Sequence, residues 1–549
     1  MKKVISAVCL SVISATSVAQ DLNDIRPAYT NERLLSHIPV RHKRESIQAA
    51  GTSNETVVDV VVFYQPSYKT MYGDYEAFQR IQKWFDLTNA AFATNGQSNF
   101  KVEIKDIMPV VSVADDVPWG NVLDADGNIV RDGAQFLFSG AVLNAGSPEY
   151  DTYQTKWKGD LVVYVREQRQ GDLHLGMAAL GGEMSSLVDN GSNPELYKTL
   201  AHEIGHNIGM NHEAAKAFVG PDYARAWECN GKYTIMYSSS AANTQLLHYS
   251  SPSITNGDEA CGVEGEADNA RLLAENFDTV SQRRDAVVSM GTVSMSDTSF
   301  AGSEEESVMI TLIRDGDLSS ATSVKIFAEN GTAEYGKDFA KAYVLAEFEA
   351  GQNTLNVEYP IVKDSEQEGD ENFTVSLKYA YKMDIGTANT ATVTLTDATL
   401  TGEAGEFSIM GTAEVTEGDV AAYTITRTNG TASAIVNVKS VASTAKGGYD
   451  YYSINELLEF KEGETEKTVT LTVVDDEEIE VSEILSLEIN SPSASAQYDI
   501  QAMNVTILDN DTVLEVNAGE FGLRANQTTV SEGAGGVTIT VVRTNGSSG

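Results

Sequence analysis

The sequence has little positive charge. Its 549 residues include 38 Lys and Arg against 79 Asp and Glu, so the formal net charge is −41 at pH 7. Nucleic acid and anionic membranes repel a polyanion of this kind, which excludes both as binding partners. The carboxylates either form a solvated surface suited to salty surroundings or include ligands for calcium, and composition alone leaves both readings open.

Long hydrophobic runs are also missing, and no stretch is long and apolar enough to cross a bilayer. The first residues instead combine Lys2 and Lys3 with a short apolar run at 4–13 and the small residues Ser17-Val18-Ala19. This pattern is typical of a signal peptide, here residues 1–19. We therefore expect a secreted, extracellular protein that is not inserted in a membrane.

Cysteine is equally scarce, with three in the whole chain. Cys9 falls within the predicted signal peptide, which leaves Cys229 and Cys261. In an oxidising compartment two remaining cysteines of one domain are expected to form a disulfide bond, with two free thiols as the alternative.

The chain is too long for a single hydrophobic core and changes texture along its length. Residues 20–55 are polar, with a basic cluster at 41–44, and predict a short pro-segment or linker. Residues 56–288 alternate strand and helix signals, which predicts an α/β (α+β) domain. Within it we expect a Val-rich strand ending at Pro66, a helix ending near Gly96, an edge strand at 176–182 and a closing helix from residue 267.

From residue 289 onward, short Val, Thr and Ile-rich strands alternate with Gly, Asn and Asp turns. The pattern repeats with a period of roughly 110 residues, which predicts consecutive all-β, immunoglobulin-like sandwiches. The predicted units are residues 289–400, residues 401–512 and the start of a third unit at 513–549. The third unit has too few strands to close, so we expect either a fragment of a longer protein or a disordered end.

Histidine is rare as well, yet three of the seven lie within the eleven residues "HEIGHNIGMNH". His202 and His206 are one helical turn apart and share a face, and Gly209 can end the helix so that His212 approaches as a third ligand. Three imidazoles with an open fourth position are typical of catalytic Zn²⁺, which activates a water molecule. Glu203 is then the expected general base.

Local sequence supports a helix at this motif. Asn193 is a suitable N-cap and Pro194 a suitable first helical residue. Of the four histidines outside the motif, His42, His174 and His248 are expected to be ordinary surface or loop residues rather than ligands.

The motif H-E-x-x-H-x-x-G-x-x-H followed by "YTIMYSS" resembles the metzincin metalloproteases. Residues 56–288 are similar to the reprolysin (adamalysin)-like branch, with Met236 in the position of the family's Met-turn. The resemblance implies an endopeptidase that binds its substrate along the edge strand "GMAALGG". Glu213 departs from the Asp usual in reprolysins, and Tyr237 is one residue too early for the zinc-proximal Tyr of astacins. The predicted pro-segment has no cysteine, which excludes a cysteine switch.

The β-sandwich repeats resemble Calx-beta domains, through "TEGD", "GGYDYY", "FKEGETEKTVTLTVVDDEEIE" and "VTILDND" in the second unit. In that family, carboxylates at one tip of the sandwich bind calcium. The resemblance implies candidate calcium ligands Glu417, Asp450, Asp475, Asp476, Asp509 and Asp511 in the second unit, and Glu304, Asp338, Asp364 and Asp397 in the first. A spacer without calcium is the alternative for both units.

Together these features predict a secreted zinc endopeptidase that hydrolyses peptide bonds of extracellular proteins. Its cofactors would be Zn²⁺ and, if the sandwich ligands are used, Ca²⁺. The sandwiches would act as calcium-binding, spacer or adhesion modules that hold the enzyme near an extracellular surface or polymer. The alternative is an adhesin or matrix protein with an incidental metalloprotease fold.

Overall fold

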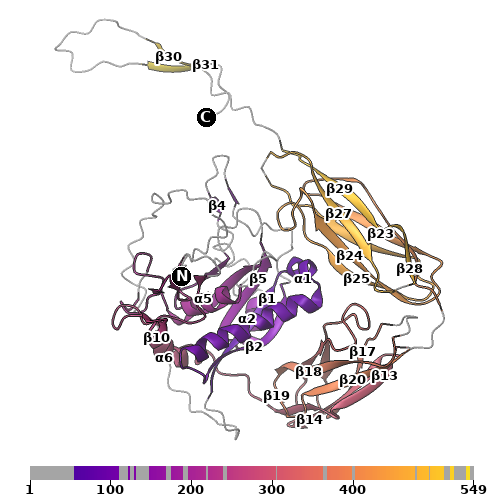
Figure 1. Cartoon of the computed structure of the whole chain (residues 1–549), viewed down its shortest axis with the longest axis horizontal. Helices are drawn as coiled ribbons and strands as arrows, with labels where there is room; N and C mark the ends of the chain where they lie inside the picture. The colour runs from indigo at the N-terminus through magenta and orange to yellow at the C-terminus, as the bar shows by residue number, and fades with distance from the viewer. Residues whose placement is uncertain are drawn as a thin grey trace, which may run out of the picture.

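The structure is a computed structural model. It describes residues 55–110, 122–123, 129–131, 148–168, 175–189, 196–217, 220–238, 244–304, 306–362, 368–397, 402–476, 479–493, 495–511, 520–524 and 540–544. Several predicted features lie outside these ranges: the signal peptide, nearly all of the pro-segment, His42, His174, Asn193, Pro194 and Asp364. Figure 1 shows an N-terminal domain of mixed helices and strands beside two β-sandwiches.

The N-terminal domain, from β1 to α6, is built on a five-stranded sheet in the order β2-β1-β5-β7-β6. Four strands are parallel, and the short strand β6 runs antiparallel to β7 at the edge. Their bounds are β1 Thr56–Tyr64, β2 Phe100–Pro109, β5 Leu161–Glu167, β6 Gly176–Ala178 and β7 Met184–Asp189.

The sheet is buried on both faces, which explains the nearly continuous apolar sequence of β1. Val60 and Val62 pack into the core under the long helices, whereas Val61 and Phe63 pack on the opposite face with Trp157. The helices are α1 Pro66–Tyr72, α2 Asp74–Thr94, α4 Pro148–Asp151, the π-helix η1 Thr152–Lys156, α5 Leu196–Ile208 and α6 Asn269–Val280. Short pairs complete the domain: β3 Val122–Leu123 with β4 Ile129–Arg131, β8 Glu228–Cys229 with β9 Lys232–Tyr233, and β10 Ser251–Asn256 with β11 Glu259–Cys261.

The first sandwich packs a four-stranded sheet, β17-β14-β12-β19, on a five-stranded sheet, β13-β20-β18-β15-β16. The second sandwich has the same topology, with β26-β23-β21-β28 on β22-β29-β27-β24-β25, so the sequence repeat is also a structural repeat.

The strands of the first sandwich are β12 Gly291–Met295, β13 Ser299–Ser303, β14 Val308–Gly316, β15 Thr322–Glu329, β16 Tyr343–Phe348, β17 Thr354–Tyr359, β18 Glu371–Tyr381, β19 Asp384–Ile385 and β20 Thr390–Thr396. Those of the second are β21 Gly405–Met410, β22 Glu414–Thr416, β23 Val420–Thr428, β24 Ala434–Ala442, β25 Asn455–Phe460, β26 Glu466–Thr472, β27 Glu483–Asn490, β28 Ala496–Ile500 and β29 Ala502–Leu508. A hairpin of β30 Glu520–Arg524 and β31 Thr540–Thr544 follows.

This architecture confirms the predicted fold class, a multidomain chain with an N-terminal α/β domain and an all-β remainder. Among the helices that the structure describes, none has the length and apolar character needed to span a membrane.

Candidate metal centre

Helix α5 and the turn after it bring the three histidines of the motif together. His202 and His206 lie on one face of the helix, which ends at Gly209 with a φ of +108°. A left-handed conformation of this kind favours glycine, and it turns the chain so that His212 faces the helix. The Nε2 atoms of His202 and His206 each lie 3.1 Å from Nε2 of His212. All three side chains are buried and could hold one metal ion.

The ring nitrogens on the far side of the cluster have partners that set the tautomer. His202 donates from Nδ1 to the carbonyl of Ile235 at 2.7 Å, and His206 donates from Nδ1 to the carbonyl of Met210 at 2.9 Å. A carbonyl oxygen only accepts, so each Nδ1 carries the hydrogen and each Nε2 presents its lone pair to the cluster. Burial lowers the pKa of His202 to about 3 and that of His212 to about 4, and it lowers the pKa of His206 as well. The histidines are therefore neutral near pH 7, the form that binds metals.

Glu203 lies between the helix and the edge strand, with its side chain buried. The backbone of Gly176 passes so close that a Cβ on this residue would lie 2.5 Å from Oε1 of Glu203 and 2.7 Å from Cγ2 of Thr199. Glycine at the start of β6 thus leaves the space that the Glu203 carboxylate occupies. The sequence placed Gly176 in an edge strand but did not indicate this contact.

Asn207 fastens the edge of the sheet to the same helix. Its side-chain amide donates to the carbonyls of Ala179 at 3.2 Å and Met184 at 3.0 Å, and its Oδ1 accepts from Ser185 Oγ at 2.5 Å. These hydrogen bonds therefore fix the hairpin of β6 and β7 relative to helix α5, which carries His202 and His206. Asn207 stands inside the motif at a position that the metal spacing leaves free, so the spacing gave no signal for it.

Met236 lies beneath the helix and is fully buried. A Cβ at Gly205 would lie 2.4 Å from Sδ of Met236, so glycine is needed there for the helix to rest on this side chain. Met236 is thus in the position expected of a Met-turn, here residues Thr234–Ser238. The ring of Tyr237 packs against that of Tyr233, with centroids 4.5 Å apart.

Glu213, the residue after the third histidine, reaches the end of this turn. Its Oε2 accepts from the backbone N–H of Ser238 at 3.0 Å, and its Oε1 accepts from Ser238 Oγ at 2.5 Å. The structure therefore gives this departure from the reprolysin pattern a local role in joining the histidine segment to the Met-turn.

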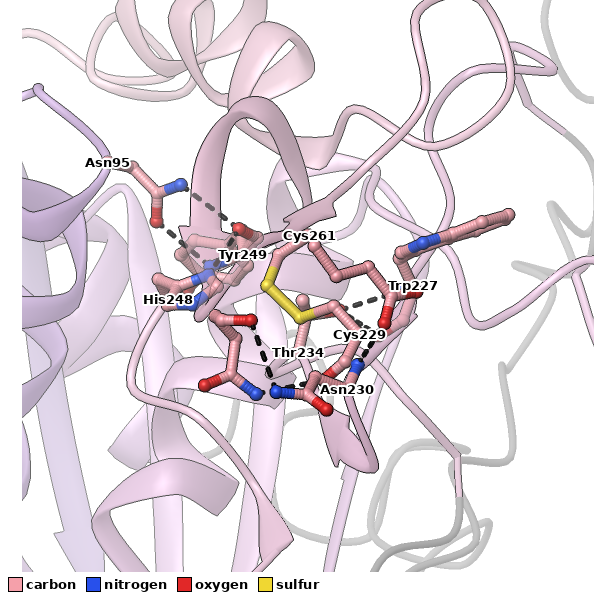
Figure 2. The surroundings of a disulfide bond; sticks show 10 residues. Asn95, Trp227, Cys229, Asn230, Thr234, His248, Tyr249 and Cys261 are labelled. Atoms are coloured by element: carbon pink, nitrogen blue, oxygen red, sulfur yellow. Dashed lines mark hydrogen bonds between the residues drawn. A yellow bond between two sulfur atoms is a disulfide. The ribbon is translucent and has the colours of Figure 1, made fainter.

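A disulfide bond supports the other end of the Met-turn (Figure 2). Cys229 and Cys261 are joined, with Cα atoms 5.0 Å apart, so β8 is linked to β11. Thr234, the first residue of the turn, exchanges hydrogen bonds with the backbone of Trp227, two residues before Cys229. The disulfide thus stabilises the strand pair from which the turn departs.

His248 lies in the loop segment after the turn. His248 is buried rather than on the surface, and burial lowers its pKa. Its carbonyl accepts from the backbone N–H of Ile235, and the neighbouring Tyr249 donates from its hydroxyl to the carbonyl of Ala201 at 2.7 Å. The side chain of Asn95 pairs with the backbone of Tyr249 (Figure 2). His248 therefore lies in a buried loop that packs against both the histidine helix and the Met-turn. Its local sequence gave no sign of this long-range packing.

The predicted calcium ligands of the first sandwich are only partly brought together. Carboxylates of Glu304 and Asp338 lie close enough to share a cation, and the third member of the group is Glu368, which the sequence analysis did not name. Asp397 accepts from the backbone N–H of Gly369, beside Glu368. Burial raises the pKa of Asp338 to about 6, and the charge of Glu371 adds to the effect.

In the second sandwich the six predicted ligands do not form one cluster. Glu417, Asp509 and Asp511 form one group, whereas Asp450 belongs to another with Glu480 and Glu483. Asp475 accepts from the side chain of Asn510 at 3.3 Å. Burial, then the charge of Asp476, raises the pKa of Glu417 to about 7. Glu480 and Glu483, the latter at the start of β27, were missed because the fold of distant segments, rather than a short motif, brings them to Asp450.

Comparison with known proteins assigns both parts of the chain to sequence families. Residues 54–250 match metallo-peptidase family M12. Residues 288–399, 409–511 and 515–549 match the Calx-beta domain. The units predicted from the sequence were residues 56–288, 289–400, 401–512 and 513–549, and each matched range overlaps one of them.

Several curated proteins are similar to part of the chain. Sodium/calcium exchanger 1 of Rattus norvegicus is 29% identical over 231 residues, which is 38% of this chain and 24% of the exchanger. The exchanger of Bos taurus is 30% identical over 38% of this chain and 23% of its own length. Adhesion G-protein coupled receptor V1 of Danio rerio is 24% identical over 40% of this chain and 4% of the receptor. The chain thus spans about a quarter or less of these relatives.

Among solved structures, the crystal structure of CBD12 from CALX1.2 is similar at 20% identity and a TM-score of 0.19, covering 40% of this chain and all of that one. The apo-form Calx CBD1 domain is similar at 24% identity and a TM-score of 0.19, covering 20% of this chain and 96% of that one.

Proposed function

Because the chain carries a metallo-peptidase M12 domain followed by Calx-beta domains, we propose that it is a secreted, zinc-dependent endopeptidase of extracellular proteins. The observation that carries the proposal is the convergence of three buried Nε2 atoms on one point. Among the described residues no fourth His, Cys, Asp or Glu joins this group, and three neutral nitrogen ligands alone are the donor set of catalytic rather than structural zinc. The candidate signal peptide supports secretion.

The residues fit a zinc ion in their chemistry as well as in their number. The hydrogen bonds from Nδ1 of His202 and His206 to backbone carbonyls orient both rings and make each Nε2 a better donor to the metal. When bound, zinc would supply a Lewis acid that polarises water and the substrate carbonyl.

Glu203 is proposed as the general base. Its carboxylate would take the proton of the attacking water and then deliver it to the nitrogen of the departing amine. The fit of Glu203 under Gly176 supports this role, because the carboxylate is held between the histidine helix and the strand where a substrate would bind.

The substrate is proposed to lie extended along β6. This strand pairs with β7 on one side and forms the edge of the sheet, so a peptide could add to it as a further strand. The Asn207 side chain fixes this edge relative to His202 and His206, which would place the scissile bond at the metal.

The proposal is tested by Glu203→Ala in the full, processed chain. The variant should retain one zinc per chain while losing chelator-sensitive caseinolytic activity by a factor of roughly 10² or more. Glu264→Ala, which removes an exposed glutamate of the same domain, should behave like wild type. A wild-type protein that binds zinc but cuts no member of a broad peptide library would contradict the enzyme assignment and favour the adhesin or matrix protein.

For the sandwiches we propose calcium binding at the carboxylate groups described above. Oxygen ligands of this number and charge suit Ca²⁺, and the groups recur in both repeats. Tandem modules of this kind would hold the enzyme near an extracellular surface or polymer. A calcium titration followed by thermal unfolding tests the point, since an unchanged unfolding midpoint would leave only the spacer role.

A further inference from the structure

The outer face of the five-stranded sheet in the first sandwich lies against the N-terminal domain. Strand β15 is buried on both faces along most of its length. Val324 and Ile326 point into the sandwich core, whereas Phe327 belongs to the hydrophobic core of the N-terminal domain. A strand of an exposed sandwich sheet would instead alternate buried and exposed residues.

A buried ion pair joins the two domains at this face. Lys325 Nζ donates to Asp106 Oδ1 at 2.7 Å and to the carbonyl of Ile107 at 2.8 Å. Both charged side chains are only 8% exposed. Asp106 stands directly after a bulge in β2, which directs its carboxylate toward the sandwich. Burying a single charge costs free energy that only a well-placed partner charge offsets. Each of these two buried charges therefore depends on the contact between the domains.

Aromatic side chains of α2 extend the same contact. Phe78 packs edge-on against Phe327 and Tyr343, with centroids 5.9 and 5.2 Å apart. Tyr75 stacks on Tyr335 at 5.2 Å. With the sandwich removed, these rings would form an exposed apolar patch, which soluble monomeric domains avoid.

The second sandwich provides an internal comparison, because strand register identifies equivalent residues. Phe327 pairs with Tyr343 as Lys439 pairs with Asn455, and Lys325 pairs with Leu345 as Asn437 pairs with Leu457. Lys325, Phe327 and Tyr343 are thus replaced by Asn437, Lys439 and Asn455. Lys439 is exposed. The ion-pairing lysine and the two aromatic rings are therefore particular to the first repeat, although Asn455 of the second sandwich also lies near Gly73 of the N-terminal domain.

Helix α2, which packs against the sandwich, also contacts strand β7 of the N-terminal sheet. Arg80, two residues after Phe78, donates to both carboxylate oxygens of Asp189, the last residue of β7. Strand β7 pairs with the edge strand β6. The sandwich and the end of β7 thus both bear on α2.

We propose that the first sandwich is a permanent intramolecular partner of the N-terminal domain, and that residues 55–397 unfold as one cooperative unit. The sandwich is then a structural part of the metallopeptidase and not a spacer. This inference concerns packing alone and stands whether or not the histidine site cleaves peptides.

The test is hydrogen exchange on the full chain, comparing Lys325→Met with Lys439→Met. Lys325→Met leaves Asp106 buried and unpaired, so exchange of slow amides in β2, α2 and β7 should accelerate roughly 100-fold. Lys439→Met removes an exposed lysine from the equivalent strand and should leave those amides unchanged. The double variant Asp106→Asn, Lys325→Met removes both charges and should restore most of the protection.

Thermal unfolding gives the second readout. Wild type should show one transition shared by the N-terminal domain and the first sandwich. In the hydrogen-exchange experiment, the amides of Val375 and Val393 should stay protected in Lys325→Met. Both residues lie in the sandwich core, so their protection would show that the sandwich is folded and has only lost its contact with the N-terminal domain. Wild-type exchange in β2, α2 and β7 of Lys325→Met, or independent melting of the two domains in wild type, would overturn the proposal.

Discussion

Glu213 accepts two hydrogen bonds from Ser238, one from its backbone N–H at 3.0 Å and one from its hydroxyl at 2.5 Å. Glu213 directly follows His212, and Ser238 closes the Met-turn. This contact therefore fixes the third histidine relative to the residue on which the histidine helix rests. Two segments about 25 residues apart in sequence are held by one carboxylate, a restraint of the kind that supports metal ligands from behind.

Glu213→Ala should lower zinc affinity by about 10- to 100-fold, since His212 loses the support of the Met-turn. Competition with a coloured chelator measures the affinity. Ser238→Ala removes only the hydroxyl donor and keeps the backbone donor, so its effect should be smaller. Equal zinc affinity in wild type and Glu213→Ala would show that the contact does not support the site.

Gly176→Ala should impair catalysis while zinc remains bound. The added methyl would lie 2.5 Å from Oε1 of Glu203, so the carboxylate must move. Displacing a proposed general base by about 1 Å can lower kcat by about 10²-fold. Gly522→Ala, where no atom lies within 4 Å of the new methyl, is the matched control. The idea fails if Gly176→Ala keeps wild-type kcat.

Acid should destabilise the metal-free protein through the histidines. In the unfolded chain they take up protons below their ordinary pKa of 6.5, whereas burial holds the folded pKa of His202 at about 3 and that of His212 at about 4. The unfolded state therefore binds more protons, and the free energy of unfolding falls as pH drops from about 6.5 toward 4, with no loss above 6.5. Urea unfolding of chelated protein over this range measures it, and a variant with all three histidines changed to Gln should show a flatter dependence.

Calcium binding at the Asp450, Glu480 and Glu483 group should release protons. Burial, then the hydrogen bond and charge of Asp450, raises the pKa of Glu483 to about 7. A cation must displace that proton, so calcium affinity should rise between pH 6 and 8. Calorimetry in two buffers of different ionisation enthalpy detects the release. Glu483→Gln should weaken binding, unlike Glu488→Gln at an exposed position on the same strand, and equal affinities in both variants would exclude this site.

Replacing Cys229 and Cys261 by Ser should lower the free energy of unfolding by roughly 3–4 kcal/mol, because the disulfide closes a loop with a sequence separation of 32. Urea unfolding measures the loss. Reductant should cause the same loss in wild type and none in the double variant. If reductant destabilises both proteins equally, the effect does not come from this bond.

Much of the histidine site could be predicted because its geometry is local. Helical periodicity places His202 beside His206, and a glycine at 209 permits the turn, so the spacing alone predicts the ligand set. The partners of Glu213, Asn207 and Gly176 depend on how distant segments pack on α5, and no short pattern encodes that packing. The contacts of these three residues could therefore be identified only from the folded structure.

The sandwiches show the same division. Alternating Val and Thr residues and an internal repeat predicted similar consecutive units, and the two sandwiches share one strand order. The grouping of carboxylates was less accessible, since loops decide whether Glu368 or Glu480 turns inward. The docking face was not predicted at all, because Lys325 and Phe327 in "TSVKIFAE" are compatible with an ordinary solvated strand face.

The shared packing of Phe327 with the core of the N-terminal domain also bears on how this protein can be recombined. A chimera cut near residue 288, between the two family matches, would divide a hydrophobic core and leave a buried aspartate without its lysine. A junction after residue 397 would carry the first repeat along with its host. The boundary between the two family matches is therefore not a suitable junction for exchanging the N-terminal domain between proteins.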